Sequence, residues 1–276
     1  MRPWGFWQNN LRYNALQLIG SFHQGGSERQ AVQLTRLLVE SGRCNVFVVT
    51  LEREGVLLDE INRLGLRDIP EFRLNSFYDF HAARQLRRLV RYIRKNEIDV
   101  VHAHDFYTNI FGMAAAGLAR VPVRIASRRE SAVRSETQRF VERSSYRVAH
   151  AVVANCEDVR QQLIREGVPA KKVRTVYNGL DVARVQSNQT DRTEILRSLN
   201  LPEQARFVTI MANMRAHVLQ PEPYCYKDHP TFLRAAQKVS ESVPDAAFII
   251  AGEGELLEAT QELARSLGIA DRTFFI

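Results

Sequence analysis

The chain has 276 residues, 45% hydrophobic and 25% charged, which is the balance of a globular protein with room for two cores. The 38 Lys and Arg residues exceed the 31 Asp and Glu residues by seven, which fits anionic partners such as nucleotides, phospholipids or nucleic acid without choosing among them. Three widely spaced cysteines, and no apolar run of about 18 residues, argue against a zinc site, a disulfide framework and a membrane span. We therefore expect a protein of the reducing cytosol.

Strands and helices are predicted to alternate along the first two thirds of the chain. The expected strands are 15–22, 45–51, 69–74, 98–104, 123–129, 151–156 and 172–179, of which 69–74 has the weakest pattern. The expected helices are 27–42, 56–65, 80–97, 107–121, 135–150 and 157–167. Alternation of this kind predicts βαβ units and a parallel, doubly wound sheet.

A polar, turn-rich stretch divides the chain. It leads us to predict a first domain at 1–181, a connector with one short helix at 182–205, and a second domain at 206–276. The second domain repeats the pattern with strands at 206–214, 246–252 and 272–276 and helices at 231–243 and 256–268. Because the chain stops inside an apolar strand, we expect the second domain to be incomplete and the chain to be a fragment or a truncated product.

Two adjacent glycines, Gly25 and Gly26, follow the first expected strand and open the first helix. Glycine permits positive φ and a close approach of another molecule, and the free N–H groups of a helix start form a natural anion site. A phosphate or carboxylate cradle is one interpretation. A tight turn without any ligand is an equal alternative.

The stretch "DVVHAHD" at 99–105 ends a strand and places His102 and His104 on one face, because strand side chains alternate. Ligands of open α/β sheets bind beyond the carboxyl ends of strands, so His104 is expected at the mouth of a site. A structural role is an alternative for His102. A metal site of both histidines and Asp105 is a weaker alternative, because no further acidic or histidine cluster completes it.

Three other stretches carry possible function. "GEG" at 252–254 follows a strand but lacks the third glycine of a dinucleotide fingerprint, which disfavours a dehydrogenase. The basic amphipathic helix at 84–95 is most simply a surface helix, with contact to anionic lipid as a minority interpretation. Arg215 just past a strand and Lys227 just before a helix are suited to a diphosphate.

Taken in order, several stretches resemble glycosyltransferase family 4, whose members have two Rossmann-like domains in the GT-B arrangement. They are "GGSERQAVQLTRLL", "DVVHAHDFYTNIFG", "IASRRE", "VANCEDVRQQLIREGVPAKKVRTVYNGLD", "MANMR…KDHPTFLRAA" and "FIIAGEGELLEATQELARSLGIADRTFFI". The resemblance implies a nucleotide-diphosphate-sugar donor, a glycan or lipid-linked acceptor, and transfer with retention of configuration. It implies no cofactor, no obligatory metal and no nucleic-acid partner.

Site residues follow from the resemblance position by position. Gly25 and Gly26 match the N-terminal loop that faces the donor phosphate and acceptor, and His104 matches the histidine that contacts the transferred sugar. Arg215 and Lys227 match the pair that neutralises the leaving diphosphate, whose charge grows as the glycosidic bond breaks. The location this implies is the cytoplasm, with peripheral contact at the inner face of the membrane as a further expectation.

Two departures from the family pattern bear on activity. The family has only a few residues between the arginine and the lysine, whereas "AHVLQPEPYCY" intervenes here at 216–226. The two glutamates, seven residues apart, that hold the donor sugar and ribose in the family are absent from these residues. The alternatives to a transferase are a nucleotide-sugar epimerase of the same architecture and a non-catalytic binding module.

Overall fold

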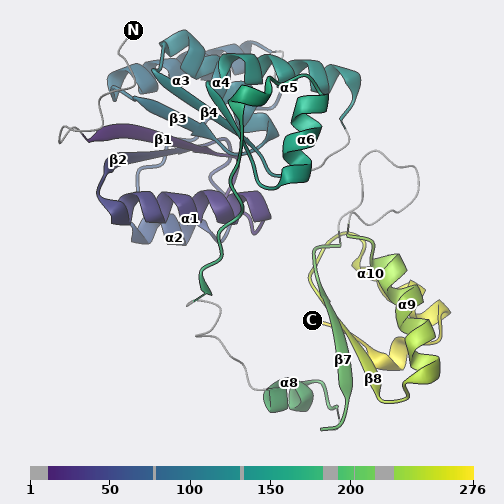
Figure 1. Cartoon of the computed structure of the whole chain (residues 1–276). Helices are drawn as coiled ribbons and strands as arrows, with labels where there is room; N and C mark the ends of the chain where they lie inside the picture. Colours follow the sequence, from purple (N-terminus) through teal and green to yellow (C-terminus); the bar gives the residue numbers. More distant parts are fainter. Residues whose placement is uncertain (1–11, 77–78, 131–133, 183–191, 202, 215–226) are drawn as a thin grey trace. The chain divides into compact units, whose positions relative to one another are not determined.

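The structure is a computed structural model that describes residues 12–76, 79–130, 134–182, 192–201, 203–214 and 227–276. The chain divides into two compact units, Met1–Leu180 and Asp181–Ile276 (Figure 1). Each unit contains a parallel β-sheet with α-helices packed on it. The predicted α/β class with Rossmann-like, doubly wound units is thus confirmed, and the second unit is the smaller one.

The first unit is built on a six-stranded parallel sheet in the order β2-β1-β3-β4-β5-β6. Its strands are β1 (Tyr13–Ile19), β2 (Cys44–Thr50), β3 (Val100–Ala103), β4 (Val123–Arg128), β5 (Ala151–Ala154) and β6 (Val173–Thr175). Its helices are α1 (Gly26–Ser41), α2 (Leu58–Arg63), α3 (Phe80–Lys95), α4 (Phe106–Ala119), α5 (Glu136–Val148) and α6 (Glu157–Arg165), with a 3-10 turn at Ala170–Lys172. Helices α1 and α2 cover one face of the sheet, and α3, α4 and α5 cover the other (Figure 1).

Strand β1 is the topological switch of this sheet. It pairs with β2 on one side and with β3 on the other, and the chain crosses over β1 between them. The loops that leave β1 and β3 therefore diverge at their carboxyl ends and open a crevice, which is where ligands bind in sheets of this kind. Gly25 and Gly26 lie beyond β1, and His104 directly follows β3.

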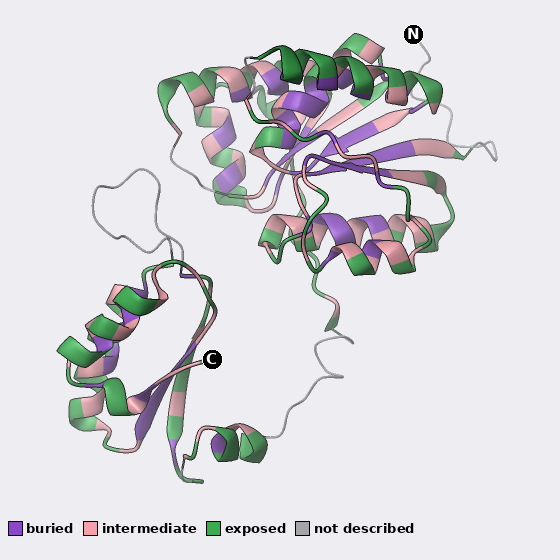
Figure 2. Cartoon of the chain, turned by 180° about the vertical axis from the view of Figure 1, so that it is seen from behind, coloured by how far each residue is buried: buried purple, intermediate pink, exposed green. Residues whose placement is uncertain are grey.

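The sheet is buried on both faces (Figure 2), as in β1, where five consecutive residues are buried. Leu16 and Leu18 of β1 belong to the core under α3 and α4, whereas Ile19 packs in the smaller core under α1 and α2. Helix α4 lies closest to the sheet at Gly112, where an added Cβ would fall 2.5 Å from Cδ2 of Leu18. Tight packing at this point fixes α4 and, with it, the residues that precede it.

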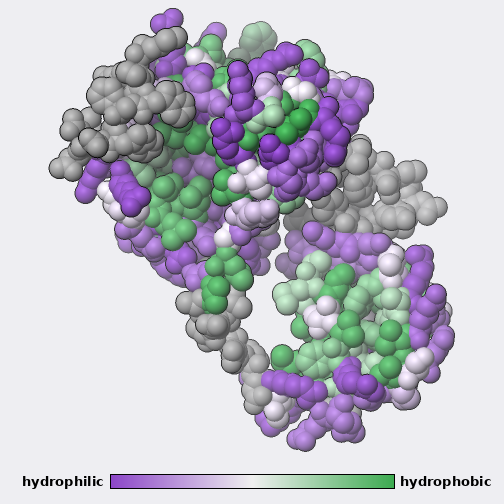
Figure 3. All heavy atoms as spheres, viewed as in Figure 1, coloured by the Kyte–Doolittle hydropathy of each residue, from purple (hydrophilic) through white to green (hydrophobic). Residues whose placement is uncertain are grey.

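The second unit has a three-stranded parallel sheet in the order β7-β8-β9. Its strands are β7 (Arg206–Met211), β8 (Ala246–Ala251) and β9 (Thr273–Phe275), and its helices are α8 (Arg192–Ser198), α9 (His229–Ser242) and α10 (Leu257–Ser266), with a 3-10 turn at Ala270–Arg272. Phe248 and Ile250 of β8 pack with Leu233 of α9 and Ala264 of α10 in one core. Apolar residues also gather on the surface of this unit in Figure 3, and Val208 and Met211 of β7 are exposed.

One predicted strand was wrong. Residues 69–74 form only an isolated bridge, between Glu71 and Thr50, rather than a seventh strand of the first sheet. Thr50 donates its N–H to the carbonyl of Pro70, and Phe72 donates back to Thr50. Pro70 has no N–H of its own, so the segment cannot extend the ladder in that direction.

Candidate active site

The start of α1 differs in its backbone from the expectation. Gly25 is the N-cap residue with φ −91° and ψ 160°, no side chain caps the helix, and neither Gly25 nor Gly26 has a positive φ. The positive φ that glycine permits is therefore not used at either position. What Gly25 does permit is a close approach, because an added Cβ would fall 2.0 Å from Oε2 of the chain's own Glu28. Around Gly26 there is no heavy atom within 4 Å of such a Cβ, so this position is open.

His104 is buried at the end of β3, with 1% of its surface exposed. Its Nε2 lies 2.8 Å from Oε1 of Gln17 on β1, and an amide oxygen can only accept a hydrogen bond, so Nε2 carries the proton. Nδ1 is then an acceptor, and no described residue of the chain hydrogen-bonds to it. Burial, followed by the charges of His102 and Arg129, lowers the pKa of His104 well below its usual value. The ring is therefore neutral, with one lone pair available.

The ring of His102 packs against the ring of His104. The two ring centroids lie 4.2 Å apart with an interplanar angle of 36°, in agreement with the prediction that both side chains share one face. Nε2 of His102 lies 2.7 Å from Oγ of Ser127 on β4. Burial, with a smaller contribution from Arg129, lowers the pKa of His102 to about 3. This satisfied, neutral histidine fits the structural role that the sequence left open for it.

Asp105 begins α4 and holds the backbone next to His104. Its Oδ1 accepts a hydrogen bond from the N–H of Thr108 at 2.9 Å, and Oγ1 of Thr108 accepts from the N–H of Asp105, which forms a capping box. The N–H of His104 also donates to Oγ1 of Thr108 at 3.1 Å. Burial raises the pKa of Asp105 to about 6, although hydrogen bonds from Thr108 lower it in part. No group of three or more His, Cys, Asp or Glu side chains suited to a metal occurs in the part of the chain that the structure describes.

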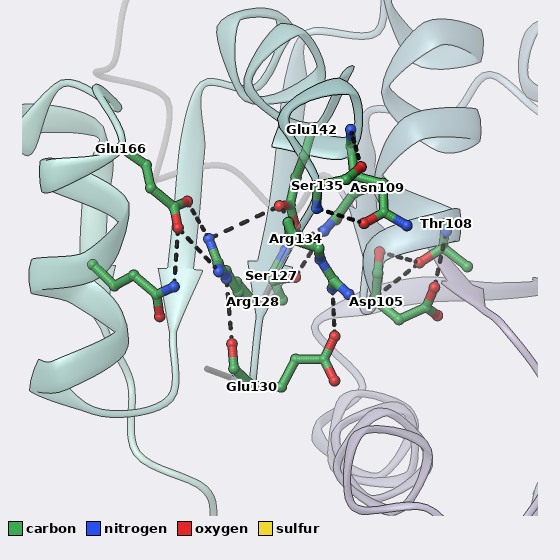
Figure 4. A network of polar contacts seen from close by, with 12 residues as sticks. Asp105, Thr108, Asn109, Ser127, Arg128, Glu130, Arg134, Ser135, Glu142 and Glu166 are labelled. Carbon is green, nitrogen blue, oxygen red and sulfur yellow. Dashed lines mark hydrogen bonds and ion pairs between the residues drawn. The ribbon is translucent and has the colours of Figure 1, made fainter. Parts of the chain in front are cut away.

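A buried ion network lies beside this site (Figure 4). Arg128, at the end of β4, hydrogen-bonds to Glu166 and lies 3.9 Å from Oε2 of Glu142, whose Oε1 accepts from the hydroxyl of Tyr146 at 2.8 Å. Arg134 pairs with Glu130, lies 3.8 Å from Oε2 of Glu142, and stacks on the ring of Phe106, with Cζ 4.3 Å from the centroid. Sequence reasoning missed this network. The only signal was the run of charged residues in "IASRRE".

Arg129 comes next in the chain and was also missed. Nη1 of Arg129 donates to Oδ1 of Asn178 at 3.0 Å, and its carbonyl accepts from Nδ2 of Asn155. The neighbouring Gly179 exchanges two hydrogen bonds with the side chain of Gln30 on α1. Residues that follow β4, β5 and β6 are thus joined to one another and to α1 at the carboxyl edge of the sheet, and the charge of Arg129 acts on His104.

In the second unit, two loops are joined directly at the carboxyl edge. Gly252 and Gly254 have φ of 147° and 151°, and a Cβ on either would fall 2.3 Å from the carbonyl oxygen of Ala212 or Met214. Met214 donates its N–H to Glu253 at 3.0 Å. "GEG" therefore needs its glycines for contact between the loops after β7 and β8.

The proposed diphosphate pair is described only in part. Lys227 is exposed and directly precedes Asp228, whose carboxylate caps α9 by accepting from the N–H of Thr231 at 3.3 Å. Arg215 and the insertion 216–226 lie outside the described residues.

Two units, each with a parallel sheet whose functional loops leave the carboxyl ends of its strands, define the GT-B class of fold. The profile of Glycosyltransferase Family 4 matches residues 24–184, more than half of the chain. The chain therefore belongs to glycosyltransferase family 4.

Relatives of this chain include a UDP-Gal:alpha-D-GlcNAc-diphosphoundecaprenol alpha-1,3-galactosyltransferase of Escherichia coli. It is 28% identical over 187 residues, which cover 63% of this chain and 45% of that protein, so the match spans less than half of the relative's length.

Among solved structures, the Anabaena protein HepE in complex with UDP and glucose is similar with a TM-score of 0.76 and 17% identity, over 96% of this chain and 69% of that one. The UDP-N-acetylglucosamine 2-epimerase from Rickettsia bellii is similar with a TM-score of 0.60 and 13% identity, over 96% and 69%. At these identities the likeness is one of fold.

Proposed function

We propose that the protein transfers a sugar from a nucleotide-diphosphate-sugar to a glycan or lipid-linked acceptor, with retention of anomeric configuration, in the assembly of a cell-surface polysaccharide or glycolipid. Membership of glycosyltransferase family 4 supports the class of reaction. The Escherichia coli relative is named as a galactosyltransferase that acts on a diphosphoundecaprenol-linked sugar, and HepE was solved with UDP and glucose. Uridine diphosphate sugars are therefore the first donors to test.

The observation that carries this proposal is the unpartnered Nδ1 of His104. A neutral imidazole fixed through Nε2 presents Nδ1 as an acceptor at the switch point of the sheet. A sugar hydroxyl is a donor that fits such an atom, and an acceptor fixed in advance orients the sugar without reorganisation. We assign His104 to contact with the transferred sugar.

Charge on the departing diphosphate needs a second set of residues. As the glycosidic bond breaks, negative charge grows on the phosphate oxygen that leaves, and cations placed there lower the barrier. We assign this role to Arg215 and Lys227, with the start of α1 at Gly25 and Gly26 facing the phosphate groups. An exposed ammonium in front of a capped helix is consistent with this role for Lys227.

A nucleotide-sugar epimerase is the second candidate, because solved epimerases share the fold. The two functions differ in chemistry, since an epimerase needs no acceptor. The higher TM-score to HepE does not decide between them, because both identities are low.

Peripheral contact with an anionic membrane is proposed for α3. Arg84, Arg87 and Arg91 are exposed on this helix, and Phe80 at its start is 96% exposed. Leu89 and Ile93 of the same helix are buried against the sheet, so the cationic face points outward. None of the helices in the described part of the chain combines the length and hydropathy that a membrane span requires.

The experiment that tests the role of His104 compares it with its stacked neighbour in the full-length protein. His104→Ala is expected to lower kcat by roughly a hundredfold, because the sugar loses its fixed contact, while the melting temperature changes little. His102→Ala is the matched control and is expected to lower the melting temperature because Ser127 loses its buried partner. Equal losses of turnover and stability in both variants would contradict the assignment.

A further inference from the structure

Arg129 lies on the same face of the first sheet as the two histidines. His102 hydrogen-bonds to Ser127 of β4, so the side chain of Ser127 points to the face that carries His102. Arg129 lies two residues after Ser127, directly beyond the end of β4, and its side chain is therefore on the same face. The charge of Arg129 reaches both imidazole rings, since it lowers the pKa of His102 and of His104. Its guanidinium therefore belongs to the candidate active site.

The neighbouring arginines are neutralised, and Arg129 is not. Arg128 pairs with Glu166 and Glu142, and Arg134 pairs with Glu130 and Glu142. Among the described residues, Arg129 contacts no carboxylate, and its side chain donates only to the neutral amide of Asn178. Burial lowers the pKa of Arg129, but a guanidinium remains charged in proteins. Within the described part of the chain, no carboxylate therefore balances the positive charge of Arg129.

Several buried polar atoms around this charge also have no hydrogen-bond partner among the residues that the structure describes. They include Nε of Arg129, Nδ1 of His104 and Oδ1 of Asn155, whose own Nδ2 holds the carbonyl of Arg129. Buried polar atoms are normally hydrogen-bonded, and leaving them unpaired costs stability. Orphan atoms from three strands at one sheet edge indicate a place where a ligand completes the bonding.

The backbone around Arg129 is held firmly. Asn155 fixes its carbonyl from β5, and Asn178 holds Nη1 from the segment after β6. Gly179 is in turn tied to Gln30 on α1 by hydrogen bonds of 2.8 and 2.9 Å. A guanidinium placed in this way loses little conformational freedom when it binds an oxyanion, and its planar fork fits carboxylate and phosphate groups.

We propose that Arg129 binds a phosphate group of a substrate at the carboxyl edge of β4, in a position to orient that substrate beside His104. The proposal rests on the proposed function for the identity of the substrate. The phosphate belongs either to a diphosphate-linked acceptor or to the diphosphate of the donor, and kinetics distinguish the two sources. The binding of phosphate itself can be measured without any turnover.

The binding test uses inorganic pyrophosphate and the full-length protein. The Nε–H resonance of Arg129, assigned by its disappearance in Arg129→Lys, is expected to shift on titration. The shift should persist in Arg147→Gln, which removes the charge of an exposed arginine on α5. A resonance that stays unmoved at saturating pyrophosphate would overturn the proposal, whether or not the protein proves to be a transferase.

The kinetic test compares an acceptor glycan linked through a diphosphate with the same glycan lacking phosphate. Arg129→Gln is expected to raise one KM by roughly tenfold to a hundredfold, the range for loss of a charge-assisted contact. A rise for the diphosphate-linked acceptor alone assigns the phosphate to the acceptor, and a rise for the donor assigns it to the donor. Unchanged KM values for both substrates in a variant that melts like the parent would overturn the proposal. Arg129→Lys serves in its place if the glutamine variant does not fold.

Discussion

Nε2 of His104 and Oε1 of Gln17 lie 2.8 Å apart, across 87 positions of sequence. Gln17 is on β1, the strand at the switch point, and Leu16 and Leu18 on either side of it are fully buried. Strand β1 therefore sets the tautomer of the histidine that we assign to the sugar. Gln17 is a positioning residue for His104.

Replacing Gln17 tests this relationship. Gln17→Leu is expected to lower kcat about tenfold or more, because the proton on the His104 ring is no longer fixed on Nε2. Gln17→Glu keeps an acceptor, and its carboxylate raises the pKa of His104, so turnover should be retained near neutral pH and fall toward acid. Nitrogen-15 spectra of His104 give the tautomer directly. Full turnover with an unchanged tautomer in Gln17→Leu would show that Gln17 has no positioning role.

Asp105 is expected to make stability fall as the pH rises. Its pKa is raised from 3.8 to about 6 in the folded protein, so the folded state binds more protons than the unfolded state between these values. The free energy of unfolding then decreases from about pH 4 to pH 6 and levels off above it. The contribution is about 1–3 kcal/mol, because the side chain is only partly shielded from solvent.

Asp105→Asn isolates this effect, since asparagine still caps α4. Relative to the parent, the variant should gain stability progressively between pH 4 and pH 6, as followed by melting temperature. Parallel pH curves for the two proteins would mean that Asp105 ionises normally.

The diphosphate clamp is tested at Lys227 and Arg215. Each substitution by alanine in the full-length protein is expected to cost roughly tenfold to a hundredfold in kcat/KM, with the loss mainly in kcat because the charge grows in the transition state. Lys238→Ala, an exposed lysine of α9, is the control. If Lys227→Ala leaves kcat/KM unchanged while Arg215→Ala lowers it strongly, a cation other than Lys227 completes the clamp.

The cationic face of α3 is tested with vesicles of anionic phospholipid. Exchanging Arg84, Arg87 and Arg91 for glutamine should weaken co-sedimentation, and the difference should fade at high salt. Arg88 is kept, because it stacks on Phe72 and bonds to Gln85. The control exchanges three other exposed arginines, Arg53, Arg63 and Arg67. If both triple variants bind equally, α3 does not form the lipid contact.

The fold was predictable because strand and helix periodicity is local. The strands at 45–51, 123–129 and 246–252 formed within one residue of their expected limits. Residues 69–74 formed no strand, since Pro70 removes a donor from the ladder. The helix expected at 107–121 begins at Phe106 instead, because the side chain of Asp105 caps its first turn.

A site residue could be predicted only where the local sequence alone indicates its position in the fold. His104 could be placed from "DVVHAHD", because strand alternation and the position after a strand are both local. Gln17 and Arg129 could not, because their hydrogen-bond partners lie 26 to 87 positions away in the sequence. The role of Arg129 also depends on the carboxylates with which Arg128 is paired. Sequence charge alone does not distinguish Arg128 from Arg129.

The most direct test of the central claim measures nucleoside diphosphate released from a uridine diphosphate sugar by the full-length protein, with and without a lipid-linked acceptor. We expect release only with acceptor, in step with a glycosylated product of unchanged anomeric configuration, and its loss in His104→Ala. Conversion of the donor without acceptor, or no detectable binding of any nucleotide sugar, would contradict the assignment as a glycosyltransferase.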